Sequence, residues 1–292
     1  MARLTGRRVS VGSLFSSMGE ALQWRLLLLW LLVMLVPATV VAVPLWRVLA
    51  GMLDHSVHAS AWARDFNASM VADVGFALSD NVGWLGGTTI LGLILTLALT
   101  PFLDGMIVGA GRAGRRLGFG GLLQAGLVEY GRMFRLMLWS LLPYLAVIGV
   151  AALGGHMAGE HAEKAVLESQ ADLGTIIAHV VLLVAFVLAQ SIMESARASF
   201  IVDLPLRSAT RAFGRGINQL LRRFFRTVIF YLVVSALGLG IAAVAGVARV
   251  HVTAVGAGGF LAALCLSQLI VVVIGWMRTA RLFALARVAA SL

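Results

Sequence analysis

Long apolar runs separated by short polar stretches dominate the chain. Six runs are long enough to cross a bilayer, because about 20 helical residues match a hydrocarbon core of about 30 Å. We place them at Leu26–Trp46, Trp84–Leu103, Phe134–Gly154, Gly174–Met193, Thr227–Ala248 and Val255–Met277. The pattern predicts an all-α fold, a polytopic membrane helical bundle that forms one membrane domain over residues 1–292.

Arginine is distributed unevenly between the two sets of loops. The N-terminal segment, the second and fourth loops and the C-terminal tail carry nearly all the basic residues. The opposite side holds only Arg47, Arg64, Lys164 and Arg249. Basic residues favour the cytoplasmic side of a membrane, so we expect both termini in the cytoplasm. Arginine greatly outnumbers lysine, as in GC-rich bacteria, so we expect a bacterial inner-membrane protein.

Composition supports this interpretation of the charge pattern. Charged residues make up 12% of the chain, about half the fraction usual in soluble domains. The net charge of +10 is explained by the orientation of the loops, so we do not expect nucleic acid as a partner. The 32 glycines suit close helix packing in a membrane.

A shift of 90 residues aligns two parts of the sequence. It places Gly126, Arg132 and Phe134 on Gly216, Arg222 and Phe224, and Asp104 on Glu194. We therefore predict a parallel repeat with copies at residues 84–154 and 174–248, both in the same orientation. Residues 10–46 and 255–277 would form a split third unit.

The segment Leu206–Arg226 has the pattern of a basic amphipathic helix. Its large apolar residues recur at helical spacing, namely Phe213, Ile217, Leu220, Leu221 and Phe224. Such a helix lies in the membrane interface with its arginines at lipid phosphates, although a loop that only sets topology would look similar. We predict lipid-phosphate or partner contact by Arg112, Arg115, Arg116, Arg207, Arg211, Arg215, Arg222, Arg223 and Arg226.

Asp104 and Glu194 are the acidic residues nearest the bilayer, and an ionisable group there is often functional. Their matched positions predict a candidate ion or proton site. We favour a structural ion pair or cap instead. Glu194 can pair with Arg197 three residues later, and Asp104 follows Pro101, where we expect the helix to be broken.

Catalytic and metal-binding patterns are weak. The sequence has no Gly-x-Ser-x-Gly elbow, no His-Glu-x-x-His and no P-loop, so we expect neither an enzyme nor a cofactor. The single Cys265 excludes an intrachain disulfide. All histidines lie on or near the predicted outer side, but we expect no metal there: His55, His58, His156, His161, His179 and His251.

The basic stretch Leu206–Arg226 is followed directly by a Phe-rich span. In this feature the chain resembles a loose group of bacterial six-helix inner-membrane proteins. The group includes the membrane domain of some glycerophosphodiester phosphodiesterases. No phosphodiesterase catalytic domain is found in these 292 residues, so that activity is not expected. We expect a transport-related subunit or membrane scaffold that contacts lipids and a partner protein. Alternatives are a permease subunit of an ATP-driven transporter and a lipid-processing membrane enzyme.

Overall fold

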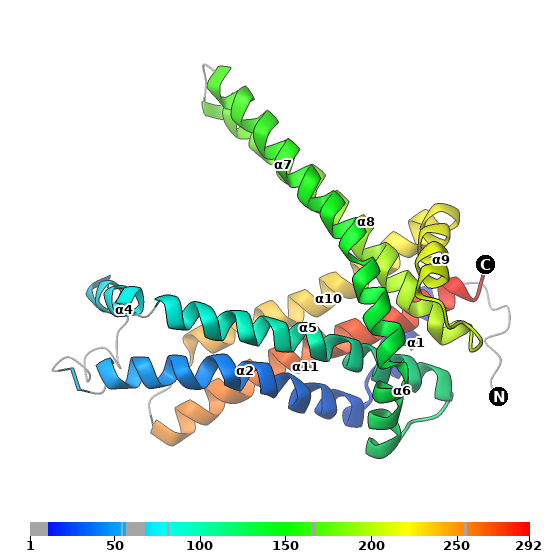
Figure 1. The fold of residues 1–292 in the computed structure, drawn as a ribbon, viewed down its shortest axis with the longest axis horizontal. Helices are drawn as coiled ribbons and strands as arrows, with labels where there is room; N and C mark the ends of the chain where they lie inside the picture. Colours follow the sequence, from blue (N-terminus) through cyan, green and yellow to red (C-terminus); the bar gives the residue numbers. More distant parts are fainter. Residues whose placement is uncertain (1–10, 54, 57–67, 81, 165–167, 254–255) are drawn as a thin grey trace. The chain divides into compact units, whose positions relative to one another are not determined.

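The computed structural model describes residues 11–53, 55–56, 68–80, 82–164, 168–253 and 256–292. Every regular element within these ranges is an α-helix (Figure 1), which confirms the predicted all-α class. The helices are α1 (Val11–Glu20), α2 (Trp24–Leu53), α4 (Ala68–Asp80), α5 (Val82–Ala113), α6 (Phe119–Trp139), α7 (Leu141–Lys164), α8 (Glu168–Val202), α9 (Ala209–Arg222), α10 (Phe224–His251) and α11 (Gly256–Ala289).

Six helical segments are long and apolar enough to cross a membrane, in agreement with the sequence. They are Trp24–Leu53, Val82–Ala113, Phe119–Lys164, Asp172–Val202, Phe224–His251 and Gly256–Ala289. The chain is therefore a multi-pass integral membrane protein. Several helices run past their predicted ends, and α11 continues beyond Met277 to Ala289.

Two prolines have opposite effects on their helices. The predicted span from Phe134 is divided at Ser140, where α6 ends and α7 begins. Pro143 explains the break, because proline has no N–H to donate and its ring clashes with the carbonyl four residues earlier, that of Trp139. The expectation that Pro101 breaks its helix is wrong, since α5 continues through it to Ala113.

The chain divides into two compact units. Unit 1 holds residues 1–23, 104–236 and 277–292, and unit 2 holds residues 24–103 and 237–276. The prediction of a single membrane domain and that of the internal repeat stay predictions.

Unit 2 is packed through small residues. Gly275 lies so close to the indole of Trp30 that an added Cβ would come within 2.7 Å of the ring. A groove of about 390 Å³ in this unit is lined mostly by apolar side chains: Trp30, Met34, Pro37, Ala38, Val41, Gly92, Thr96, Val271 and Ile274.

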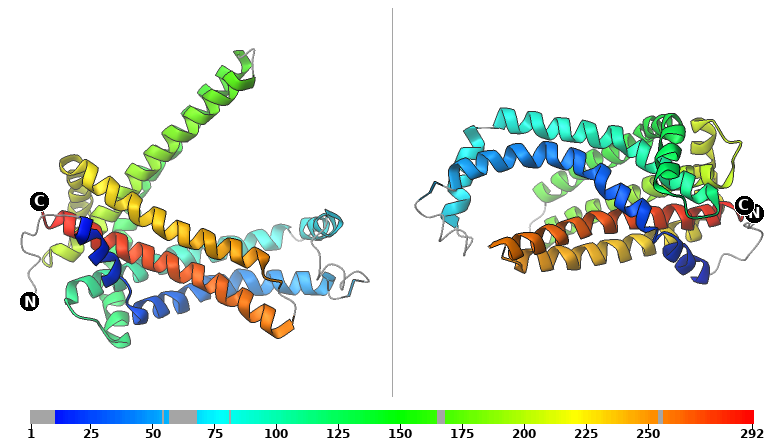
Figure 2. Two further views of the ribbon diagram at one scale, coloured as in Figure 1. Left: turned by 180° about the vertical axis from the view of Figure 1, so that it is seen from behind. Right: turned by 90° about the horizontal axis from the view of Figure 1, so that it is seen from below.

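In unit 1, α7 and α8 lie side by side as a long hairpin, and α9 packs against α8 (Figure 2). Large apolar side chains cover the outside of the hairpin, as expected for helices in lipid; examples are Leu145, Ile148 and Leu183. Unit 1 also contains all the residues of the site described next.

Candidate functional site

Five charged side chains meet inside unit 1, and we call this group the charge centre. Its members are Asp104 on α5, Glu194 and Arg197 on α8, and Arg278 and Arg281 on α11. One oxygen of Asp104 forms an ion pair with Arg197 Nε at 3.0 Å and accepts a hydrogen bond from Arg278 Nη2 at 2.9 Å. The centre therefore joins three helices that are far apart in sequence.

Glu194 completes the charge centre. One of its oxygens lies 3.5 Å from Arg197 Nη1 and 3.7 Å from Arg281 Nη2. The guanidinium of Arg281 also lies over the ring of Tyr231, 5.1 Å from its centroid, and Arg281 donates to the hydroxyl of Ser235 at 3.3 Å. The pair of Glu194 with Arg197 expected from sequence is thus present.

The two acids of the charge centre are almost fully enclosed. Asp104 and Glu194 are each 2% exposed, and a buried carboxylate is tolerated only when it is paired. Their second oxygens, Asp104 Oδ1 and Glu194 Oε2, have no hydrogen-bond partner within the described structure. The arrangement suits an internal tie between helices, and the ion or proton site stays a prediction.

A second group, the Glu129 cluster, consists of Arg112, Glu129 and Arg132. Glu129 is buried and pairs with Arg112 at 2.5 Å and Arg132 at 3.0 Å. Arg112 Nε also donates to the carbonyl of Phe200 at 2.6 Å. Arg112 therefore ties α5 to α6 and α8, and the lipid or partner contact predicted for it stays a prediction.

The other arginines of the predicted contact set lie at or near the surface. Arg215 pairs with Asp203 at 2.5 Å, and Arg223 is half-buried and donates to the carbonyl of Ser291 at 3.4 Å. The remaining members are exposed and make no ion pair within the described ranges: Arg115, Arg116, Arg207, Arg211, Arg222 and Arg226.

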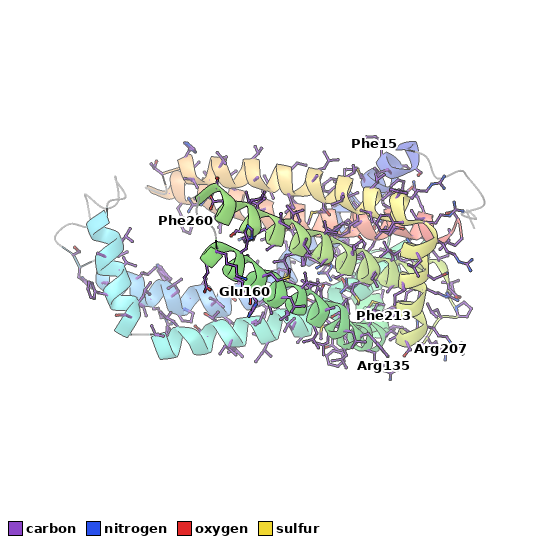
Figure 3. All side chains as sticks on the ribbon, turned by 90° about the horizontal axis from the view of Figure 1, so that it is seen from above. Phe15, Arg135, Glu160, Arg207, Phe213 and Phe260 are labelled. Atoms are coloured by element: carbon purple, nitrogen blue, oxygen red, sulfur yellow. The ribbon has the colours of Figure 1, made fainter. Side chains whose placement is uncertain are left out.

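The helix α9, predicted from periodicity, is present between Ala209 and Arg222. The hydroxyl of Ser208 caps its N-terminus by accepting from the backbone N–H of Arg211 at 3.3 Å, as Ser commonly does. At its other end the helix stops before Arg223, and α10 begins at Phe224. Figure 3 shows that α9 lies across the direction of α8.

The face that α9 turns toward the protein consists mainly of small residues. Ala209, Ala212 and Gly216 are buried. A Cβ on Gly216 would lie 2.5 Å from the carbonyl oxygen of Ile192 and 2.9 Å from the nitrogen of Ala196. Only glycine permits this approach of α9 to α8.

Most of the predicted apolar stripe lies on a different face of α9. Leu220 is buried, but Ile217 and Leu221 are exposed, Leu221 by 75%. Phe225, just past the end of α9, is 76% exposed. We call Ile217, Leu221 and Phe225 the apolar flank. Exposed apolar side chains of this size mark an interaction surface.

The arginines occupy the next face round the helix. Arg211, Arg215 and Arg222 recur at spacings of four and seven residues, with Arg207 immediately before the helix. We call Arg207, Arg211, Arg215 and Arg222 the basic face. Since these spacings keep side chains on one side of a helix, α9 has three separate faces: one buried, one apolar and one basic.

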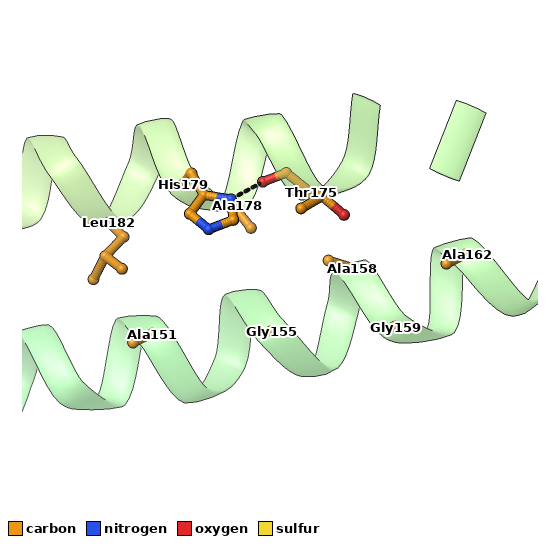
Figure 4. Close-up of a pocket in the computed structure, with 9 residues that line it drawn as sticks. All are labelled: Ala151, Gly155, Ala158, Gly159, Ala162, Thr175, Ala178, His179 and Leu182. Atoms are coloured by element: carbon orange, nitrogen blue, oxygen red, sulfur yellow. Dashed lines mark hydrogen bonds between the residues drawn. The ribbon is translucent and has the colours of Figure 1, made fainter. Parts of the chain in front are cut away.

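The histidines do not gather in the described part of the chain. His156 lies 3.5 Å from Glu160, and both are exposed on α7, while His179 contacts the carbonyl of Thr175 at 2.7 Å. Within the described ranges no group of three metal-ligating residues is seen, and His58 lies outside them. His179 borders a groove of about 300 Å³ between α7 and α8 that is otherwise lined by Thr175, Leu182 and small residues (Figure 4).

Three members of these charge groups were missed by sequence reasoning: Glu129, Arg278 and Arg281. Both arginines were assigned to the C-terminal tail. The apolar run after them, Leu282–Ala286, could have shown that the helix continues. Glu129 stands three residues before Arg132, the spacing of Glu194 and Arg197, so the same i to i+3 rule would have found its pair.

Comparisons with protein-family models, with curated proteins and with solved structures found no match for this chain.

Proposed function

We propose that this protein is a non-enzymatic inner-membrane component, a transport-related subunit or membrane scaffold. In this proposal both termini and α9 lie on the cytoplasmic side, as the arginine distribution predicts. The α9 region contacts lipid headgroups and a partner protein there. The resemblance of Leu206–Arg226 to six-helix inner-membrane proteins supports the same placement.

The observation that carries the proposal is the division of the arginines into two sets. Arg112, Arg197, Arg278 and Arg281 are turned inward and bound to carboxylates. Such pairs hold helices in a fixed arrangement. Most of the basic face of α9 remains at the surface beside exposed apolar side chains. A rigid internal frame with a basic, apolar-flanked surface is suited to docking.

The two alternative functions differ in what they require. A permease subunit of an ATP-driven transporter would use α9, which lies across α8, to dock the ATPase (Figure 3). A lipid-processing enzyme would need a polar cavity with several titratable groups. The two grooves described above are lined mainly by small and apolar residues.

Affinity purification in mild detergent tests the proposal. The bait is the full chain, and the test variant reverses three exposed charges of the basic face: Arg207→Glu, Arg211→Glu and Arg222→Glu. The control reverses three basic residues of the predicted outer side: Arg47→Glu, Lys164→Glu and Arg249→Glu. We expect a co-purifying protein to be lost with the test variant and kept with the control.

The proposal fails if no protein depends on the basic face, or if both variants retain the same proteins. An ATPase subunit that is lost with the test variant would favour the permease alternative.

A further inference from the structure

We propose that α9 is an interfacial helix that binds anionic phospholipids. The basic face contacts the phosphodiester headgroups, and the apolar flank enters the upper acyl region. This inference rests on the proposed function, because it names the lipid class that the same surface recognises.

The orientation of α9 is fixed by its buried face. Gly216 brings the helix against the backbone of α8 at Ile192, and this contact places the glycine side of α9 against α8. The apolar flank then lies between the buried face and the basic face. A helix lying in a membrane interface needs this order, with protein contact on one side, apolar residues toward the chains and cations toward the headgroups.

The charge of α9 selects an anion. The helix has no acidic residue, and within the described ranges its only neighbouring carboxylate contact is Asp203, which pairs with Arg215. Arg207, Arg211 and Arg222 keep their charge for another partner. Arg211 and Arg222 are eleven residues apart, which is about 16 Å along a helix axis, so they can meet different headgroups.

The corresponding helix of the predicted repeat, α6, provides an internal comparison. It also exposes large apolar residues, with Leu127 70% and Val128 64% exposed. Its charges differ, because Arg132 is bound to Glu129 and only Arg135 is fully exposed. A preference for anionic over neutral lipids is therefore expected of α9, whereas α6 would contact lipid through its apolar residues.

Native mass spectrometry in mild detergent tests the inference with two lipids that share the same chains, dioleoyl phosphatidylglycerol and dioleoyl phosphatidylcholine. The test variant is Arg207→Gln, Arg211→Gln and Arg222→Gln. The control, Arg47→Gln, Lys164→Gln and Arg249→Gln, removes the same number of charges elsewhere. A third protein carries lysine at the three test positions.

We expect wild-type protein to retain more phosphatidylglycerol than phosphatidylcholine. Each basic residue near an anionic surface strengthens association about fivefold, so the test variant should lose about 100-fold in affinity for phosphatidylglycerol. Its affinity for phosphatidylcholine should not change. The control should match wild type, and the lysine variant should retain most of the binding.

Equal retention of both lipids by wild type would overturn the inference, as would an equal loss in test and control variants. Displacement of phosphatidylglycerol by an equal concentration of inorganic phosphate would assign the surface to a soluble anion instead. The outcome is independent of partner capture: if a protein still depends on the basic face while lipid selectivity is absent, only the lipid inference fails.

Discussion

Arg197 is the residue that joins the two buried carboxylates of the charge centre. Its guanidinium lies 3.0 Å from Asp104 and 3.5 Å from Glu194, and all three side chains are at most 8% exposed. Without Arg197, Asp104 would keep only Arg278 at 2.9 Å and Glu194 only Arg281 at 3.7 Å. Removing one member of a buried ion pair is strongly destabilising, because buried charge is then left less well compensated.

We therefore expect Arg197→Met to lower the free energy of unfolding by about 3 kcal/mol or more. Arg207→Met, at an exposed position, should change it by less than about 0.5 kcal/mol. Unfolding in mixed micelles of mild detergent and dodecyl sulfate, followed by circular dichroism, measures both. Equal stability of the two variants would show that the charge centre does not hold the helices together.

A substitution of Gly216 is a second single-residue test of stability. A methyl group at this position would collide with the backbone of α8, and overpacking of this kind typically costs about 1–3 kcal/mol. Gly214, two residues earlier on α9, has no atom within 4 Å of an added Cβ. Replacing it with alanine should stabilise the helix by up to about 1 kcal/mol.

The measurement is the unfolding of Gly216→Ala and Gly214→Ala under the same conditions. We expect Gly216→Ala to lower the free energy of unfolding and Gly214→Ala to raise it. Stabilisation by Gly216→Ala would contradict the close approach of α9 to α8.

At the scale of elements, α9 should show different surroundings on its two exposed faces. Spin labels at Leu221→Cys and Arg211→Cys, in a Cys265→Ala background, report this after reconstitution into vesicles. The label at residue 221 should be more accessible to oxygen, which concentrates in lipid. The label at residue 211 should be more accessible to a water-soluble nickel chelate. Equal accessibility of both sites to the chelate would place α9 in water and remove its interfacial role.

Sequence periodicity found α9 but only partly predicted its contacts. Large apolar residues were expected to share one face, whereas the buried contact is made mainly by Ala209, Ala212 and Gly216. In a membrane protein, apolar side chains gain nothing from leaving lipid for protein, and small residues mark the helix contacts. The break at Pro143 followed a local steric rule, but Pro101 was accommodated within α5, which the sequence alone could not decide.

Both copies of the predicted repeat contain a glycine at a close helix contact. A Cβ on Gly105 would lie 2.9 Å from the carbonyl oxygen of Gly126, and a Cβ on Gly216 would lie 2.5 Å from the carbonyl oxygen of Ile192 in the preceding helix. The breaks do not coincide, because Ser140 falls on Phe230 inside α10 at a shift of 90 residues. The repeat therefore stays a prediction, and variants at Gly126 and Gly216 should destabilise to a similar degree if it holds.

At the scale of the whole molecule, the sequence predicted the six long apolar helices because length and hydropathy are local properties. It did not predict which charges meet, because Asp104 and Arg278 are brought together only by packing. Within unit 1, Glu160 lies at the far end of the α7–α8 hairpin from Arg135 and Arg207 (Figure 3). This separation of acidic and basic ends is what the predicted orientation requires.

The membrane orientation of these two ends tests the central claim most directly. Single cysteines are introduced as Glu160→Cys and as Arg211→Cys in the Cys265→Ala background, and spheroplasts are treated with a membrane-impermeant maleimide. We expect residue 160 to be labelled in intact spheroplasts and residue 211 to be labelled only after the membrane is opened. Labelling of residue 211 from outside, with protection of residue 160, would contradict the account.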